Sequence, residues 1–372
     1  MLSLQRYCLK LLPLKIIIAI LILFCESFTV AGQEENHFLV EGRMHYGFVM
    51  AHSPRVNHLV TGHTHGFQLN LGMQGMKSRM QRIYNSPQTG LSLAYLDFAN
   101  PEVLGSGICL LAYADLPVVR KSNFLFSIHL ADGLGFATKR FDPVENRKDP
   151  VLASKLNAAI QIFFQTKYFI SKRTDLRLSL GLTHFSNGSY ATPNLGINNI
   201  SLSSGVIFYF DTVRTLASRG DVEPPEKKIR FEVIAAGGPK EIYPAGGKKY
   251  GSWTVSAIAF KAFSHKYRLG IGTDFIYDLS LTERFIRDSV FDSSVSDRMR
   301  SGIYIANELI LSRLTAVLDL GFYVYSPFKG DGNMYHRIGL KYFCTDHLFI
   351  NYTLRTHYGK ADNIELGLGY RF

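Results

Sequence analysis

A histidine and a serine stand two residues apart in the segment 183–188, as His184 and Ser186. In a β-strand, residues i and i+2 lie on the same face, so these two side chains can share a hydrogen bond if the segment is a strand. A base beside a hydroxyl is the minimum machinery for an activated serine nucleophile. Because Ser-Asn-Gly is also an ordinary turn sequence, the pair by itself indicates catalysis only weakly.

The first 32 residues predict the compartment. They begin with three basic residues, continue through an apolar block at 16–24, and end on the small residues Val30, Ala31 and Gly32. This is the layout of a secretory signal peptide, so we expect residues 1–32 to be removed and the mature chain to begin near Gln33. Cys25 follows the bulky Phe24, which disfavours a lipoprotein cleavage site.

Two cysteines remain after the signal peptide, Cys109 and Cys344. They can form one disulfide, although two thiols on separate strands are more often small apolar residues, and a disulfide framework is excluded. After the signal peptide no apolar run reaches the length of a transmembrane helix, which excludes a helical membrane protein. What recurs is alternation of apolar and other residues, as at 67–72 and 177–182.

This alternation predicts sixteen β-strands, many of which reach the roughly ten residues that a tilted strand needs to cross a bilayer. We place the first series at 37–51, 62–74, 89–99, 105–115, 122–132, 156–169, 174–186 and 198–210. The second series lies at 228–238, 249–263, 266–281, 298–312, 314–325, 335–344, 347–357 and 362–372.

The fold class is therefore all-β, and we expect a transmembrane antiparallel β-barrel. Short breaks at 264–265 and 312–313 read as tight turns, and 132–155 and 281–298 as longer loops. The alternative is a water-soluble sandwich or lipocalin-like barrel. The signal peptide, the aromatic residues near strand ends and the terminal Phe372 favour the membrane.

For a membrane barrel, we interpret the net charge of +11 as basic loops and rims that face anionic lipid headgroups. Since the chain contains no recognisable nucleic-acid-binding module, we expect no nucleic-acid partner. The spacing of His63 and His65 would suit two metal ligands on one strand face, yet no Cys, Asp or Glu nearby completes a set, so no metal site is predicted.

The segment 211–227 interrupts the strands with charged residues and two prolines, and is the best candidate for a polar loop or linker between residues 33–210 and 228–372. The strand before it ends Gly-Val-Ile-Phe-Tyr-Phe210, which echoes the terminal Gly-Leu-Gly-Tyr-Arg-Phe372. We favour one barrel of about 14–16 strands, because half-barrels would leave unpaired edges in lipid. The alternative is an eight-stranded barrel followed by a second β unit.

The runs His-Phe-Ser-Asn-Gly at 184–188 and Pro-Asn-Leu-Gly-Ile-Asn-Asn at 193–199, with the strand at 200–210, resemble the lipid A 3-O-deacylases of the PagL type, also described as acyloxyacyl hydrolase-like. The resemblance covers about residues 37–210. It implies an eight-stranded outer-membrane barrel with its His-x-Ser-Asn motif late in the strand order. The small family members do not explain the second series of strands, whereas longer relatives share its closing segment, 357–372.

Carried onto this sequence, the resemblance implies that Ser186 attacks an ester carbonyl of lipid A and that His184 is the base. Asn187, with nearby backbone N–H groups, becomes the candidate oxyanion stabiliser. The resemblance implies no metal and no organic cofactor. The implied partners are lipid A or lipopolysaccharide and the outer-membrane lipids.

The chain departs from the family at the acid of the triad. The family has a glutamate about a dozen residues after the serine, and here Asn198 occupies that region, with no Asp or Glu from 176 to 210. An amide can orient an imidazole but cannot stabilise imidazolium by charge, and losing a triad carboxylate can cost on the order of 10⁴ in rate. Asp362 and Glu365 are candidates for a substitute acid. The alternative function is a non-catalytic barrel acting as a pore, an adhesin or an envelope scaffold.

Overall fold

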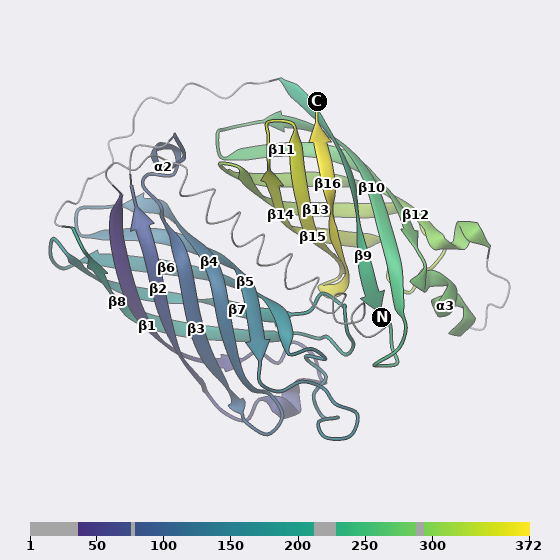
Figure 1. The fold of residues 1–372 in the computed structure, drawn as a ribbon, viewed down its shortest axis with the longest axis horizontal. Helices are drawn as coiled ribbons and strands as arrows, with labels where there is room; N and C mark the ends of the chain where they lie inside the picture. Colours follow the sequence, from purple (N-terminus) through teal and green to yellow (C-terminus); the bar gives the residue numbers. More distant parts are fainter. Residues whose placement is uncertain (1–35, 76–78, 212–227, 288–293) are drawn as a thin grey trace, which may run out of the picture. The chain divides into compact units, whose positions relative to one another are not determined.

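The computed structural model describes residues 36–75, 79–211, 228–287 and 294–372. The predicted signal peptide and nearly all of the predicted linker at 211–227 lie outside these residues. The chain divides into two compact units, each built around one closed β-barrel (Figure 1).

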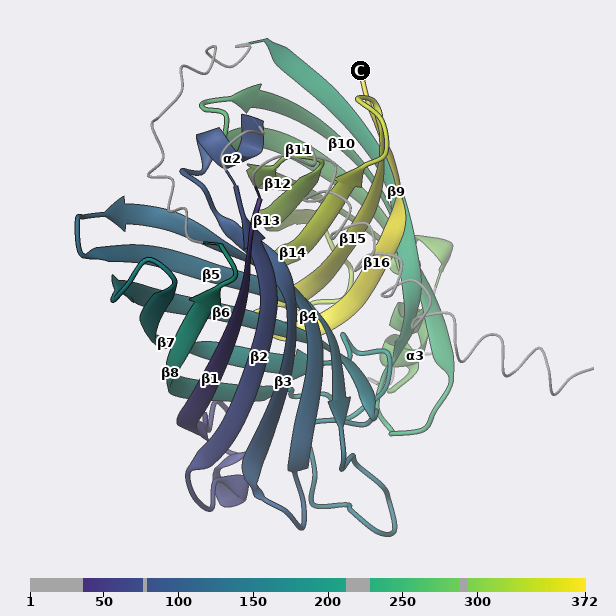
Figure 2. The same ribbon diagram turned by 60° about the vertical axis from the view of Figure 1, so that its left-hand side comes forward.

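Eight antiparallel strands close the first barrel, in the order of the sequence. They are β1 (His37–Val49), β2 (Thr64–Gln74), β3 (Gln88–Asn100), β4 (Gly105–Arg120), β5 (Phe124–Ala137), β6 (Leu156–Phe169), β7 (Thr174–Ser186) and β8 (Ile197–Tyr209). Figure 2 shows β1 to β4 side by side along one wall of this barrel. Short helices occur in its loops, namely η1 (Asn57–Leu59) and α2 (Arg79–Ile83).

The second barrel also consists of eight antiparallel strands. They are β9 (Ile229–Glu241), β10 (Lys249–Ala262), β11 (Tyr267–Asp278), β12 (Met299–Leu311), β13 (Leu314–Tyr325), β14 (Met334–Phe343), β15 (Leu348–His357) and β16 (Lys360–Arg371). The helices α3 (Ser280–Arg287) and η2 (Val295–Arg298) lie between β11 and β12. No helix in the described ranges is long and apolar enough to cross a membrane.

The all-β antiparallel barrel is confirmed, but the favoured single barrel of about 14–16 strands is wrong. The first series closes when β1 pairs with β8, and the second closes when β16 pairs with β9. The first and last strands of each set of eight therefore pair with each other. Two barrels can form without leaving unpaired strand edges in lipid, which was the reason for favouring a single barrel. The arrangement found is the alternative, an eight-stranded barrel followed by a second β unit.

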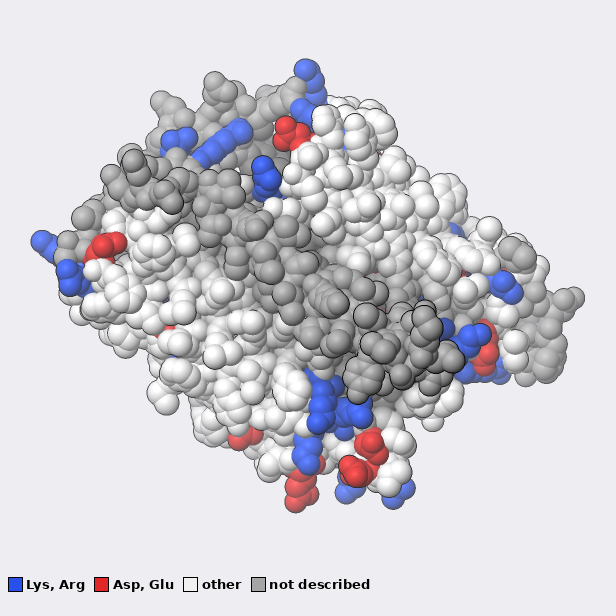
Figure 3. All heavy atoms as spheres, viewed as in Figure 1, with Lys and Arg blue, Asp and Glu red and all other residues white. Residues whose placement is uncertain are grey.

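The strands alternate between an apolar outer face and a polar interior. Along β7, Leu176, Leu178 and Leu180 are exposed at 45%, 49% and 55%, whereas the intervening Arg177 and Ser179 are buried. Apolar side chains facing outward over polar ones facing inward are the pattern of a barrel in lipid. In Figure 3, broad areas of the described surface on the viewed face carry no charged side chain.

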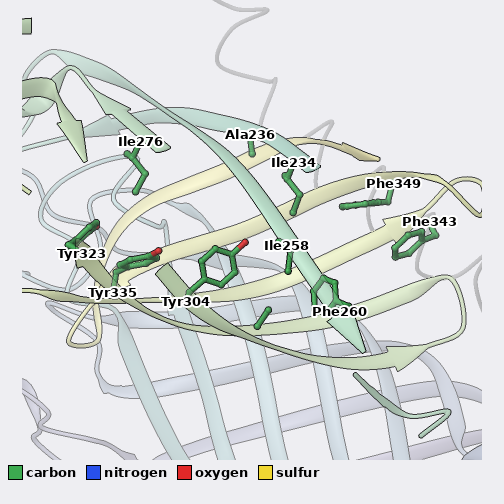
Figure 4. Packing of buried hydrophobic residues seen from close by; sticks show 11 residues of the cluster. Ile234, Ala236, Ile258, Phe260, Ile276, Tyr304, Tyr323, Tyr335, Phe343 and Phe349 are labelled. Atoms are coloured by element: carbon green, nitrogen blue, oxygen red, sulfur yellow. The ribbon is translucent and has the colours of Figure 1, made fainter. Parts of the chain in front are cut away.

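Buried side chains fill both barrel interiors. In the first barrel, Arg177 forms ion pairs with Glu41 and Asp115. In the second, Arg337 contacts Glu365 at 2.6 Å and Asp274 at 3.1 Å. The second barrel also holds an apolar cluster that includes Tyr304, Tyr323, Tyr335, Phe343 and Phe349 (Figure 4). The Arg337 guanidinium lies 5.4 Å from the centre of the Tyr304 ring.

Cys109 and Cys344 are both free thiols, so the disulfide considered from the sequence is not present. Cys109 is buried on β4, where it serves as a small apolar residue.

Candidate active site

His184 and Ser186 lie at the end of β7 on the outer face of the first barrel. They continue the outward positions of Leu176, Leu178 and Leu180 along the strand. At the same end of the barrel, the chain leaves β1 at Val49 and β3 at Asn100 and enters the loop 138–155. The predicted nucleophile and base are therefore at outward positions of the strand, close to the loops, where His184 is partly exposed and Ser186 is buried, with 7% of its surface exposed.

Phe185 anchors this strand end from the inside. Its fully buried ring meets Phe98 edge to face, with 5.3 Å between centroids. Space for the ring exists because Gly107 and Gly135 lack side chains, and a Cβ on either would come within 2.7 Å of it. A bulky inward side chain between two outward functional ones fixes how His184 and Ser186 are presented.

Asn198 lies directly across the strand pair from His184, at the start of β8. Its Oδ1 atom is 2.6 Å from His184 Nδ1. A carbonyl oxygen can only accept, so in this contact the Nδ1–H of His184 donates. The neutral imidazole then carries its lone pair on Nε2, which is the tautomer that a general base needs.

No pattern in the sequence indicates that His52 belongs to the site. His52 follows β1 and contacts Asn198. Its Nδ1 atom is 3.2 Å from Asn198 Nδ2 and 3.1 Å from the main-chain oxygen of Met50. The main chain joins the same segments, because the Met50 N–H donates to the Asn198 carbonyl at 2.7 Å. Residues 50–52 and 198 are distant in sequence, and only the pairing of β1 with β8 brings them together.

Gly196 lets the chain pass close to the imidazole. It has φ +77°, and a Cβ there would lie 2.8 Å from His184 Cε1 and 3.0 Å from the carbonyl oxygen of Phe185. Its N–H donates to Val151 in the β5–β6 loop at 2.9 Å. Asp149 shapes that loop by accepting from the Val151 N–H at 2.8 Å, and burial raises the pKa of this carboxyl to about 6.

Asn187 is buried in the turn that follows Ser186. Its N–H donates to the side-chain oxygen of Asn194 at 3.0 Å, and its own side-chain oxygen accepts from Ala191 at 3.3 Å. These bonds give Asn187 a role in shaping the turn. Its role as an oxyanion stabiliser stays a prediction.

The two candidates for a substitute acid lie in the interior of the second barrel. Asp362 contacts Lys240 at 2.7 Å and Arg355 at 3.0 Å. Glu365 contacts Arg337 at 2.6 Å and Arg355 at 2.8 Å. Both carboxylates are thus balanced by buried cations, and the partner of His184 is the amide of Asn198.

Three potential metal ligands, Asp331, His357 and Asp362, place their ligating atoms within 4.8 Å of one another in the second barrel. The carboxylates also pair with cations, since Arg284 and Arg300 each contact Asp331 at 2.7 Å. Such a neighbourhood is already neutralised and disfavours a further cation. His63 and His65, considered from the sequence, lie instead against the ring of Tyr46.

Two family models match the chain. Residues 65–206 match the model described as lipid A 3-O-deacylase (PagL), and residues 229–372 match acyloxyacyl hydrolase, C-terminal domain. No curated protein matches the chain.

Among solved structures, Neisserial surface protein A is 13% identical, with a TM-score of 0.31 over 48% of this chain and 100% of its own. OccAB4 of Acinetobacter baumannii is 11% identical, with a TM-score of 0.24 over 92% of this chain and 98% of its own. The family matches extend from β2 to β8 and over the whole second barrel, and the chain belongs to the PagL-type lipid A 3-O-deacylase and acyloxyacyl hydrolase family.

Proposed function

We propose that this protein is an outer-membrane serine esterase that removes an ester-linked acyl chain from lipid A or lipopolysaccharide. Membership of the PagL family supports lipid A as the substrate and the outer membrane as the location. The observation that carries the mechanism is the 2.6 Å contact between His184 and Asn198, on the outer face of the strand that also holds Ser186.

Ser186 is the nucleophile in this proposal. His184 Nε2 takes the proton from the Ser186 hydroxyl while Oγ forms a bond to the ester carbonyl carbon. When the tetrahedral intermediate collapses, the carbon–oxygen bond to the sugar hydroxyl breaks, and His184 returns the proton to that oxygen. Water, activated by His184, then releases the fatty acid and restores Ser186.

The position on the barrel wall suits a lipid substrate. Lipid A is held in the membrane by its acyl chains, and the outer face of β7 presents exposed leucines up to the site. A substrate can therefore approach laterally without leaving the leaflet. We place the loop-bearing end of the barrel at the cell surface, with the signal peptide removed after export.

The non-catalytic alternatives receive less support. A pore needs an open lumen, whereas the interiors of both barrels hold buried ion pairs such as Arg177–Glu41 and Arg337–Glu365. An adhesin or a scaffold does not require the tautomer-setting contact between His184 and Asn198.

Mass spectrometry of lipid A tests the proposal. The full chain is expressed in a Gram-negative host beside Ser186→Ala, His184→Ala and the control Ser204→Ala, which alters an exposed outward serine of β8. Heat-modifiable gel mobility verifies that each variant has folded. We expect the parent and Ser204→Ala to remove one acyl chain and the two site variants to remove none. If lipid A is unchanged although the parent protein is folded, the proposed deacylase activity is refuted.

A further inference from the structure

We propose that His52 is a positioning residue of this site, which holds the side-chain amide of Asn198 so that its oxygen faces His184. The inference rests on the proposed function and extends it to a residue outside the Ser-His-Asn set. The structural basis for this inference is the 3.2 Å contact between Asn198 Nδ2 and His52 Nδ1.

An asparagine in the acid position creates a problem that a carboxylate does not have. Both oxygens of a carboxylate accept, so either can receive the Nδ1–H of the histidine. An amide has one accepting end and one donating end. If its NH₂ faced His184, it would donate to Nδ1, the ring proton would move to Nε2, and that nitrogen could no longer accept the serine proton.

The contacts of His52 select the productive orientation of the amide. With Nδ1 unprotonated, His52 accepts from the Asn198 NH₂, which leaves the Asn198 oxygen to accept from His184 at 2.6 Å. The reversed amide would bring its oxygen against the lone pair of His52 and its NH₂ against His184. His52 thus distinguishes two orientations that differ little in shape.

The backbone holds His52 where this selection works. The Met50 N–H donates to the Asn198 carbonyl at 2.7 Å, which fixes the end of β1 beside the residue that His52 must contact. The Nδ1 atom of His52 also lies 3.1 Å from the Met50 oxygen. One nitrogen cannot donate to Met50 and accept from Asn198 in the same state. The proposal requires the tautomer in which the proton of His52 is on Nε2 and Nδ1 accepts from Asn198.

The test measures Ser186 reactivity in two ways, as deacylation kinetics on lipid A and as the labelling rate with a fluorophosphonate, a serine-reactive probe. The variants are made in the full-length protein. His52→Phe removes the acceptor and keeps a ring, whereas His52→Gln restores an acceptor oxygen. His58→Phe is the control, because His58 is an exposed histidine of the same loop.

We expect His52→Phe to lower kcat and the labelling rate roughly tenfold with little change in KM, the size expected for loss of one hydrogen bond. His52→Gln should recover most of this loss, and His58→Phe should match the parent. In an Asn198→Asp background, His52→Phe should change the rates less than about twofold, because a carboxylate needs no orientation.

Three results would overturn the positioning role. In an active parent, His52→Phe could have no effect, or His52→Gln could be as slow as His52→Phe. The third is an equal loss from His52→Phe with Asn198 and with Asp at that position, which would indicate a general structural effect. A folded parent that neither labels nor deacylates would instead refute the proposed function, and with it this inference.

Discussion

Asn198 is the residue at which this site departs from a Ser-His-acid arrangement. It keeps the geometric part of the role, because its oxygen receives the Nδ1–H of His184 at 2.6 Å. It does not supply the negative charge that would stabilise imidazolium as the serine proton is transferred. In the proposed mechanism, Asn198 therefore sets the tautomer of His184 but does not supply the electrostatic contribution of a carboxylate.

Replacing Asn198 by aspartate should supply that charge without moving the partner atom, since the two side chains have the same shape. We expect Asn198→Asp to raise kcat for deacylation on the order of 10²-fold, which is less than the roughly 10⁴-fold effect of a triad carboxylate because Asn198 already holds the tautomer of His184. The measurement is the initial rate of fatty-acid release from purified lipid A, with equal amounts of folded protein.

The double variant Asn198→Asp with His184→Ala is the control for this gain. If the new carboxylate acts through the imidazole, the double variant is as inactive as His184→Ala alone. A gain that persists without His184, or no gain in the single variant, would contradict the role assigned to Asn198.

The candidate site was only partly predictable from the sequence. His184 and Ser186 stand two apart in a strand, and Asn198 lies at the family spacing, so local pattern and resemblance indicate all three. His52 has no such signal, because its contact with Asn198 spans 146 positions and depends on the register between β1 and β8. Alternation specifies which face a residue occupies, but not which distant strand lies beside it.

At the scale of elements, all sixteen strands were predicted, and the errors are at their ends. The fourth strand was predicted to stop at 115 but continues to Arg120, because the register shifts between Pro117 and Val119, and a proline is tolerated in a strand at such a bulge. The fifth was expected to end at 132 and continues to Ala137. Residues 132–155 were predicted as a loop, yet the strand continues, and Gly135 makes room for the Phe185 ring.

The start of β8 supports the site through Gly196, and Gly196→Ala tests this support. The added Cβ would meet His184 Cε1 at 2.8 Å, in a left-handed conformation at φ +77° that itself disfavours alanine. Displacement of the imidazole by part of an ångström should lower kcat by about 10–100-fold. Deacylation kinetics with folded protein provide the measurement.

Gly246→Ala is the matched control for the backbone contribution. Gly246 has φ +75°, and a Cβ added there would meet no atom within 4 Å. Gly246→Ala should have a conformational cost similar to that of Gly196→Ala, roughly 1 kcal/mol, and should leave the rate of deacylation unchanged. Equal loss of activity in the two variants would show that strain, and not displacement of His184, causes the effect.

At the scale of the whole molecule, the sequence signals for two barrels were present but not decisive. The similar endings at 205–210 and 367–372 belong to β8 and β16, the strands that close the two barrels. Closure depends on hydrogen bonds between the first and last strand of each set, and period-two alternation is the same in one large barrel as in two small ones.

Each barrel has its own buried ionic network, so each should have its own stability. Arg177 in the first barrel donates to Gln165 at 2.9 Å and Gln88 at 2.6 Å, and pairs with Glu41 and Asp115. Removing one member of such a network leaves buried charges uncompensated, at a cost of about 3–5 kcal/mol. We expect Arg177→Met to destabilise the first barrel, and Arg337→Met the second, by amounts of this order.

The chain contains a single tryptophan, Trp253 on β10, which reports on the second barrel alone. In urea titrations of the folded protein, Arg337→Met should move the Trp253 fluorescence transition to lower urea and leave fluorophosphonate labelling of Ser186 at its parental midpoint. Arg177→Met should do the reverse. Each β-ladder closes on itself, and no strand pairing in the described residues joins the two barrels. A common shift of both transitions in either variant would show that the two barrels unfold as one cooperative unit.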